Sequence, residues 1–109
     1  MKVKSKIWFE LNDGILMSEG RAQLLSLIAS TGSLNKAAKE MNMSYQKAWK
    51  FIDSSNQVAK QALVERQIGG KNGGGTVLTE YGKKVLEAYE TINKKCWEYL
   101  DEEIAKLNI

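Results

Sequence analysis

The segment from residue 33 to residue 56, SLNKAAKEMNMSYQKAWKFIDSSN, constrains the fold of this chain more than any other. Ser33 and Ser44 each precede a helix-forming run, where a hydroxyl side chain accepts a hydrogen bond from a free backbone N–H of the first turn. Between the runs, Asn42 is one of the few residue types that tolerate the left-handed conformation of a sharp turn. The segment therefore predicts two short helices joined by a tight turn, the pattern of a helix-turn-helix.

The flanking sequence predicts the elements that surround this motif. The aromatic and β-branched run at residues 6–11 precedes Asn12-Asp13-Gly14, a strong signal for a hairpin turn. Ser18 can cap a following helix with apolar residues at helical spacing, and Gly32 can end it. The expected elements of this single domain, 1–109, are an N-terminal hairpin at 1–17, a first helix at 18–31, the helix-turn-helix at 33–58, a second hairpin at 63–79 and a C-terminal helix at 80–107.

The second hairpin carries a loop with five glycines among the seven residues 69–75. The loop lacks the residue order of both glycine-rich nucleotide-binding motifs, and its lysine, Lys71, is followed by Asn72. We therefore expect a flexible tip whose Lys71 and backbone N–H groups approach a phosphate. The alternative is a hairpin end that makes no contacts.

The C-terminal helix carries apolar residues at heptad spacing. They are spaced 4, 3, 4 and 3 residues apart, a seam typical of helix pairing, and a second apolar strip lies beside them. Because a domain of this size cannot easily bury both strips, we expect one to pack on a second copy and form a homodimer. The alternative is a helix folded back on its own domain. The expected dimerisation residues are Val85, Tyr89, Ile92, Cys96 and Tyr99.

Composition excludes several classes of site. The 109 residues include no histidine and one cysteine, which excludes a disulfide framework, a Cys/His zinc site and histidine acid–base catalysis within one chain. We therefore expect neither an enzyme nor a cofactor. No apolar run approaches the roughly 20 residues of a membrane span, and the N-terminus has no apolar signal core. We expect a soluble cytoplasmic protein without a membrane partner.

Positive charge collects on the helix-turn-helix half of the chain. The net charge of +3 divides into +1 over residues 1–32, +4 over 33–75 and −2 over 76–109. This distribution favours double-stranded DNA as a partner, since a phosphate backbone attracts such a cluster. The alternative is a solvated surface of mixed charge.

Helical spacing divides the second helix of the motif into two faces. Ala48, Ile52 and Ser55 are expected to point inward, which turns the opposite face outward. Lysine and glutamine reach base edges, whereas hydroxyl groups near a helix start usually meet phosphate. We therefore expect Gln46 and Lys50 on bases and the DNA backbone contacted by Ser44, Tyr45, Lys47 and, from the preceding helix, Lys36.

Two further side chains near this face have open interpretations. Trp49 is expected to pack against its own domain, with stacking on a thymine methyl group or sugar as the alternative. Arg66, in the second hairpin, either contacts phosphate or braces the hairpin through an acidic neighbour. The lysines of the helix surface have a simpler alternative, which is that they only keep it soluble.

Two blocks of the sequence resemble known regulators. Leu63-Val64-Glu65-Arg66 and Leu78-Thr79-Glu80-Tyr81-Gly82 are similar to the "LFxR…LTeaG" pattern in the wing of LysR-type winged-helix domains. SYQKAW, NQVAKQALVER, GGKNGGG and VLTEYG together resemble the N-terminal domain of the ModE family of molybdate-responsive transcription regulators. The resemblance implies a mainly α fold with a small β component, namely a winged helix-turn-helix with a long C-terminal dimerisation helix.

The same resemblance implies a transcription regulator that binds a near-palindromic DNA site as a homodimer. ModE regulators carry molybdate-binding β-barrel modules after this domain, and these 109 residues contain no counterpart of them. We therefore expect a stand-alone DNA-binding unit that binds no molybdate. The alternative function is an interaction module that dimerises with another regulator through its C-terminal helix.

Overall fold

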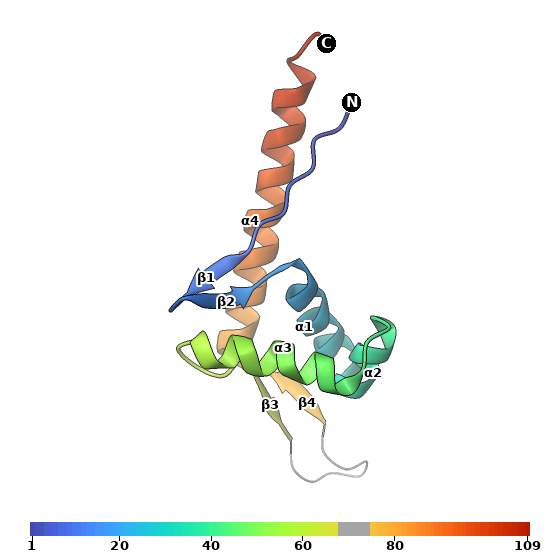
Figure 1. Ribbon diagram of the computed structural model, residues 1–109, viewed down its shortest axis with the longest axis vertical. Helices are drawn as coiled ribbons and strands as arrows, with labels where there is room; N and C mark the ends of the chain where they lie inside the picture. Colours follow the sequence, from blue (N-terminus) through green and yellow to red (C-terminus); the bar gives the residue numbers. More distant parts are fainter. Residues whose placement is uncertain (68–74) are drawn as a thin grey trace.

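The structure is a computed structural model, in which residues 1–67 and 75–109 are described. It is mainly helical with two small two-stranded sheets, so the predicted fold class is confirmed. Figure 1 shows a globular body from which one long helix projects. The elements in chain order are β1 (Phe9–Leu11), β2 (Gly14–Met17), α1 (Glu19–Thr31), α2 (Leu34–Glu40), α3 (Tyr45–Val58), β3 (Val64–Arg66), β4 (Thr76–Leu78) and α4 (Glu80–Ala105).

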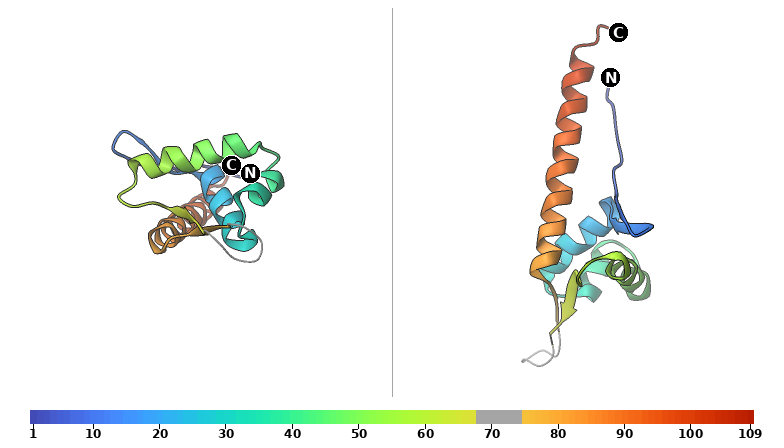
Figure 2. Two further views of the ribbon diagram at one scale, coloured as in Figure 1. Left: turned by 90° about the horizontal axis from the view of Figure 1, so that it is seen from below. Right: turned by 90° about the vertical axis from the view of Figure 1, so that its left-hand side faces the viewer.

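The N-terminal hairpin is shorter than predicted. Its first strand begins at Phe9, not at residue 6, because Phe9 already pairs with Met17, the last residue of β2. Asn12 and Asp13 both have positive φ, at 52° and 62°, as a type I′ turn requires. Residues before Phe9 therefore have no partner strand and run in extended form beside α4 (Figures 1 and 2).

The helix-turn-helix follows the local signals in the sequence. Ser33 Oγ accepts a hydrogen bond from the Lys36 N–H at 3.1 Å, and Ser44 Oγ accepts one from the Lys47 N–H at 3.1 Å. Asn42 in the turn has a φ of 54°. Both predicted caps and the predicted left-handed turn are confirmed.

The core is formed where α1, α2 and α3 meet the two hairpins. Ser18 caps α1, and Gly32 ends it with a φ of 71°, a conformation that glycine adopts without steric cost. Apolar side chains from every helix and from β2, β3 and β4 share this one core. Its largest fully buried apolar side chains are Met17, Leu24, Leu25, Ile28, Ile52 and Leu63.

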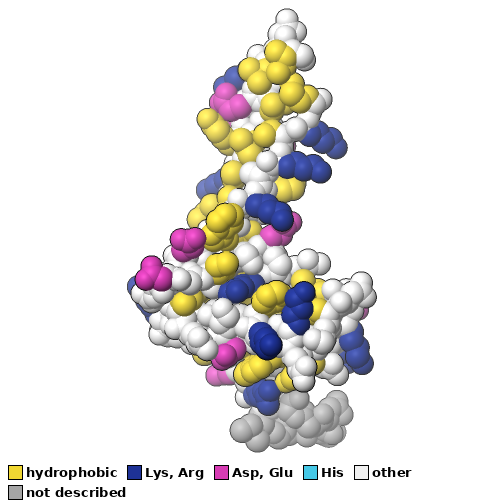
Figure 3. Space-filling model, viewed as in Figure 1, with side chains coloured by type: hydrophobic (Ala, Val, Ile, Leu, Met, Phe, Trp, Pro, Cys, Tyr) yellow, Lys and Arg dark blue, Asp and Glu magenta, His cyan; other side chains and the backbone are white. Residues whose placement is uncertain are grey.

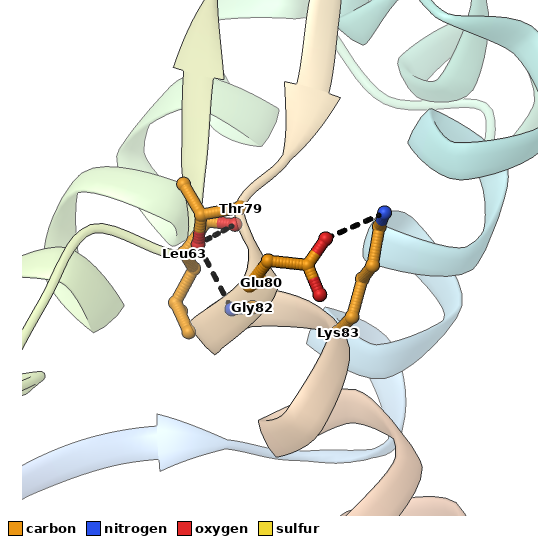
Figure 4. Close-up of polar contacts among 5 residues, drawn as sticks. All are labelled: Leu63, Thr79, Glu80, Gly82 and Lys83. Atoms are coloured by element: carbon orange, nitrogen blue, oxygen red, sulfur yellow. Dashed lines mark hydrogen bonds and ion pairs between the residues drawn. The ribbon is translucent and has the colours of Figure 1, made fainter.

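A close backbone contact joins the second hairpin to α4 (Figure 4). Thr79 Oγ1 accepts a hydrogen bond from the Gly82 N–H at 2.9 Å and donates one to the Ala62 carbonyl at 2.6 Å. The Thr79 N–H donates to the Leu63 carbonyl at 3.0 Å. A Cβ atom on Gly82 would overlap that same Leu63 carbonyl oxygen. The Thr–x–x–Gly part of the wing pattern therefore has a physical cause. Thr79 caps α4, and Gly82, which has no Cβ, lets the Leu63 carbonyl approach the helix.

Helix α4 has 26 residues, about 39 Å at the usual helical rise, and ends two residues before the predicted limit of 107. The molecule measures 59 × 29 × 22 Å, with its long axis vertical in Figure 1, where α4 rises from the body. The Tyr89 hydroxyl donates a hydrogen bond to the Ile7 carbonyl at 3.0 Å, and Ser5 Oγ lies 3.7 Å from Cys96 Sγ. The N-terminal segment therefore covers one side of α4. Among the described helices, none is long and apolar enough to cross a membrane.

Candidate nucleic-acid interface

Helix α3 presents one buried face and one exposed face, as its sequence predicted. Ala48, Ile52 and Ser55 are buried in the core. Tyr45, Gln46, Lys47, Trp49, Lys50 and Asp53 are exposed. Figure 1 shows α3 lying across the body above the second hairpin, at the end of the molecule away from the projecting part of α4. The buried face of α3 therefore packs on the core, and its opposite, polar face is accessible along the length of the helix.

A polar contact of the partly buried Arg21 fixes α3 against the N-terminal hairpin. Arg21 Nη1 donates hydrogen bonds to the Ile15 carbonyl at 2.6 Å and to Ser55 Oγ at 2.8 Å. Its guanidinium also lies 5.5 Å from the centre of the Phe51 ring. Burial lowers the pKa of Arg21, although arginine remains charged in proteins. Sequence reasoning missed this role, because the partners are 6, 34 and 30 residues away and no local pattern specifies them.

Gln46 and Lys50, the predicted base-reading residues, lie one helical turn apart and are both exposed. Neither side chain forms a hydrogen bond or ion pair with another described residue. Asp53, the acidic residue on the same face, accepts a hydrogen bond from Gln57 Nε2 at 3.0 Å. The two donors that could meet base edges are therefore not engaged within the described part of the chain.

The predicted backbone-contacting residues lie around the start of α3. Ser44 uses its oxygen as the helix cap, which leaves its hydroxyl proton available. Lys47 Nζ lies 5.9 Å from the centre of the Phe51 ring, so Lys47 sits at the flank of the helix. Lys36 is exposed in the first turn of α2. The Tyr45 hydroxyl accepts a hydrogen bond from within the chain, which leaves its own proton available as well.

The donor to Tyr45 is Arg66, the last residue of β3. Arg66 Nη2 lies 2.8 Å from Tyr45 Oη, and the Arg66 guanidinium carbon lies 5.0 Å from the centre of the Trp49 ring. Arg66 thus braces the hairpin through two aromatic residues and not through the acidic neighbour that was one expectation. Trp49 is 37% exposed. Most of its surface is covered, and its ring packs against Arg66 of the same domain, as expected for packing against its own domain.

Basic side chains are visible on both parts of the molecule. Figure 3 shows Lys and Arg side chains on the globular body and also along the projecting part, where many hydrophobic side chains are exposed beside them. Lys71, the predicted phosphate contact in the glycine-rich loop, lies outside the described residues.

Residues 21–83 match the family described as bacterial regulatory helix-turn-helix protein, lysR family. The chain belongs to this family. The matched range extends from α1 through the second hairpin, which is the wing of a LysR-type domain, into the first turn of α4. The candidate interface residues described above therefore lie within the LysR-type domain, whereas most of α4 lies beyond the match.

Curated relatives share more of the chain than the LysR-type match does. This chain is 40% identical over 95 residues to "Molybdenum transport protein ModE" of Azotobacter vinelandii, and the alignment covers 87% of this chain and 35% of that protein. It is 35% identical over 108 residues to "DNA-binding transcriptional dual regulator ModE" of Escherichia coli K12, covering 96% and 41%. "Molybdenum-pterin-binding protein MopB" of Rhodobacter capsulatus is 40% identical over 79 residues, covering 72% and 29%. The chain spans less than half the length of these relatives.

The five predicted dimerisation residues, all on α4, lie in different environments. Val85 and Tyr89 are buried in the chain's own core, which corrects their assignment to a dimer surface. Cys96 is half-buried beside Ser5. Ile92 and Tyr99, two helical turns apart, are 49% and 59% exposed. Of the five, only Ile92 and Tyr99 are exposed enough to meet a partner. Trp97 is also exposed, but at 3.6 residues per turn it lies on another side of the helix.

Proposed function

We propose that the chain is a sequence-specific DNA-binding transcription regulator that acts in the cytoplasm. The observation that carries this proposal is the exposed face of α3, which presents Gln46 and Lys50 without partners among the described residues. A helix of this kind enters the major groove, where lysine binds guanine edges and glutamine binds adenine edges. Family membership and the relative named as a DNA-binding regulator support the same function.

Selection of bound sites from random DNA tests this proposal directly. We expect one enriched motif, with binding that weakens steeply as salt increases. In the double variant Lys50→Met, Gln46→Ala, the ratio of affinity for that motif to affinity for other DNA should fall by about 10-fold or more, since each good base contact contributes about 1–3 kcal/mol of discrimination. Lys95→Met is the matched control, because Lys95 is an exposed lysine on α4. Failure to enrich any motif would contradict the proposal.

We further propose that two copies bind a near-palindromic site. Ile92 and Tyr99 are exposed apolar residues on the projecting part of α4, which extends away from α3. A twofold contact there would leave both DNA-binding faces free. Half-sites one helical turn, or a multiple of it, apart in the selected motif would support the dimer. A single unrepeated motif bound by one chain would contradict it.

The alternative proposal is an interaction module that joins another regulator through α4. The same exposed apolar residues favour it, because they fit a different helix as well as a second copy. The two proposals differ in the effect of the variants. If activity in the cell survives the Gln46 and Lys50 substitutions but is lost in Ile92→Glu, α4 and not α3 carries the function.

The prediction that these 109 residues bind no molybdate can be checked in the same assays. The described strands form two separate hairpins, not the β-barrel to which the resemblance assigns molybdate binding. DNA affinity should therefore be unchanged when molybdate is added. A molybdate-dependent change in affinity would show a sensing site in this chain.

A further inference from the structure

Arg66 connects the wing to the start of α3 through two different interactions. It donates a hydrogen bond to the hydroxyl of Tyr45, the first residue of α3, at 2.8 Å. It also places its guanidinium 5.0 Å from the centre of the Trp49 ring, one turn further along the helix. Tyr45 and Trp49 are 21 and 17 residues away in sequence, so this contact depends on the folded position of the wing.

A second contact holds the other end of the same strand. Leu63, just before β3, donates its backbone N–H to Asn56 Oδ1 of α3 at 2.8 Å. Asn56 and Tyr45 are 11 residues apart, about 16 Å along the helix axis. The two contacts therefore bind β3 near both ends of α3 and set the direction of the strand relative to the helix.

The partner strand β4 is held elsewhere. The Thr76 N–H donates to the Gly32 carbonyl at 3.0 Å, and the Thr79 N–H donates to the Leu63 carbonyl at 3.0 Å. The first bond fixes β4 to the end of α1, and the second fixes the end of β4 to Leu63, at the start of the wing. They place no constraint on the aromatic side chains of α3, so Arg66 supplies that constraint.

We propose that Arg66 is a positioning residue of the DNA-binding surface: it orients Tyr45 and Trp49 and does not neutralise a DNA phosphate. This inference rests on the proposed DNA binding by α3. Tyr45 and Trp49 lie beside Gln46 and Lys50, so their orientation shapes the surface that meets the bases. Trp49, 37% exposed with Arg66 against its ring, would contact a thymine methyl group or a sugar.

Arginine suits this role for reasons that lysine does not share. A planar guanidinium donates in a fixed fork and stacks on an aromatic ring, whereas an ammonium group is a compact point charge. Lysine is nevertheless a good phosphate ligand. Arg66→Lys therefore separates the two roles, because it keeps the charge and removes the combined hydrogen bond and stacking interaction.

The test compares wild type, Arg66→Lys, Arg66→Met and Tyr45→Phe on the selected motif and on scrambled DNA over a range of salt concentrations. We expect both Arg66 variants to lose about 10-fold in affinity for the motif and to change little on scrambled DNA, with the salt slope of wild type. The double variant Tyr45→Phe, Arg66→Met should bind the motif as tightly as Arg66→Met alone, because both substitutions remove the same hydrogen bond. Lys95→Met controls for the loss of one positive charge.

A phosphate ligand would behave differently. Arg66→Met would then reduce the salt slope by about 0.9, since the protein would neutralise one phosphate fewer, and it would weaken binding to both DNAs. Arg66→Lys would bind like wild type. That result would overturn the proposal, as would full motif affinity in both Arg66 variants. Circular dichroism checks that the variants remain folded.

A measurement without DNA separates this inference from the proposed function. In a Trp8→Phe, Trp97→Phe background, Trp49 is the single tryptophan. Its emission should change in both Arg66→Lys and Arg66→Met, and no change would overturn the inference whether or not DNA binds. If emission changes but wild type prefers no motif, the contact exists and the proposed DNA recognition is what fails.

Discussion

At the scale of single residues, glycine at position 82 is required by a neighbouring backbone. A Cβ atom there would overlap the Leu63 carbonyl oxygen, which the hairpin uses to accept the Thr79 N–H. We expect Gly82→Ala to destabilise the fold by about 1–3 kcal/mol, the usual cost of overpacking, in urea denaturation.

The matched control is Gly20→Ala in α1. A Cβ atom on Gly20 has no other atom within 4 Å apart from its immediate surroundings in the helix. Alanine should therefore stabilise the protein, by up to about 1 kcal/mol, because it has the higher helix propensity. Equal effects of the two substitutions would show that the close contact at Gly82 has no energetic weight.

At the scale of elements, the start of α3 depends on its capping serine. Ser44 Oγ accepts the Lys47 N–H, so Ser44→Ala should cost about 1 kcal/mol of stability. Ser54→Ala is the control in the same helix, since Ser54 is exposed in its interior and alanine favours helix there. Thermal denaturation should separate the variants, and a Ser44→Ala protein as stable as Ser54→Ala would contradict the role of the cap.

The capping residues also show what could be predicted from the sequence. Ser33, Ser44 and Asn42 act on backbone groups within a few residues, so their effects are encoded locally. The wing contact of Arg66 and the Arg21–Ser55 hydrogen bond join residues 17 to 34 apart, and no local pattern specifies such pairs. The interior and exterior of α3 were predictable from periodicity, whereas the aromatic contacts on its surface were not.

The heptad seam of α4 shows, for a longer element, that a sequence pattern does not identify contacts with distant residues. Its spacing correctly predicted a long amphipathic helix, but a period identifies an apolar face without identifying what covers it. Val85 and Tyr89 are covered by the body and the N-terminal hairpin, so that part of the seam belongs to the core. The expected seam is therefore reduced to the residues beyond Tyr89.

At the scale of the whole molecule, Tyr89 links α4 to the N-terminal segment. Its hydroxyl donates to the Ile7 carbonyl, and burial, followed by the negative charge of Glu19, raises its pKa. The folded protein therefore keeps this proton at a pH where the unfolded chain, with a pKa near its ordinary value of about 10, loses it. The stabilisation is complete below about pH 10 and decreases as pH rises toward the folded pKa.

Tyr89→Phe removes this titration together with the hydrogen bond. We expect it to be less stable than wild type at neutral pH, by about 0.5–1.5 kcal/mol, and to lose less stability on going above pH 10. Tyr99→Phe retains Tyr89 and should keep the steeper alkaline loss. Urea denaturation across this pH range measures both, and parallel curves for wild type and Tyr89→Phe would contradict the assignment.

The exposed part of α4 makes stability depend on association if the proposed dimer forms. Folding is then coupled to pairing, so the melting temperature of wild type should rise with protein concentration. A charge at Ile92 or Tyr99 would be buried without a partner in that contact. Ile92→Glu should therefore be monomeric in analytical ultracentrifugation and melt at a temperature independent of concentration. Glu87→Gln, at an exposed polar position of the same helix, should remain dimeric. A monomeric wild type at all concentrations would rule out the twofold contact and leave α4 free for a different partner.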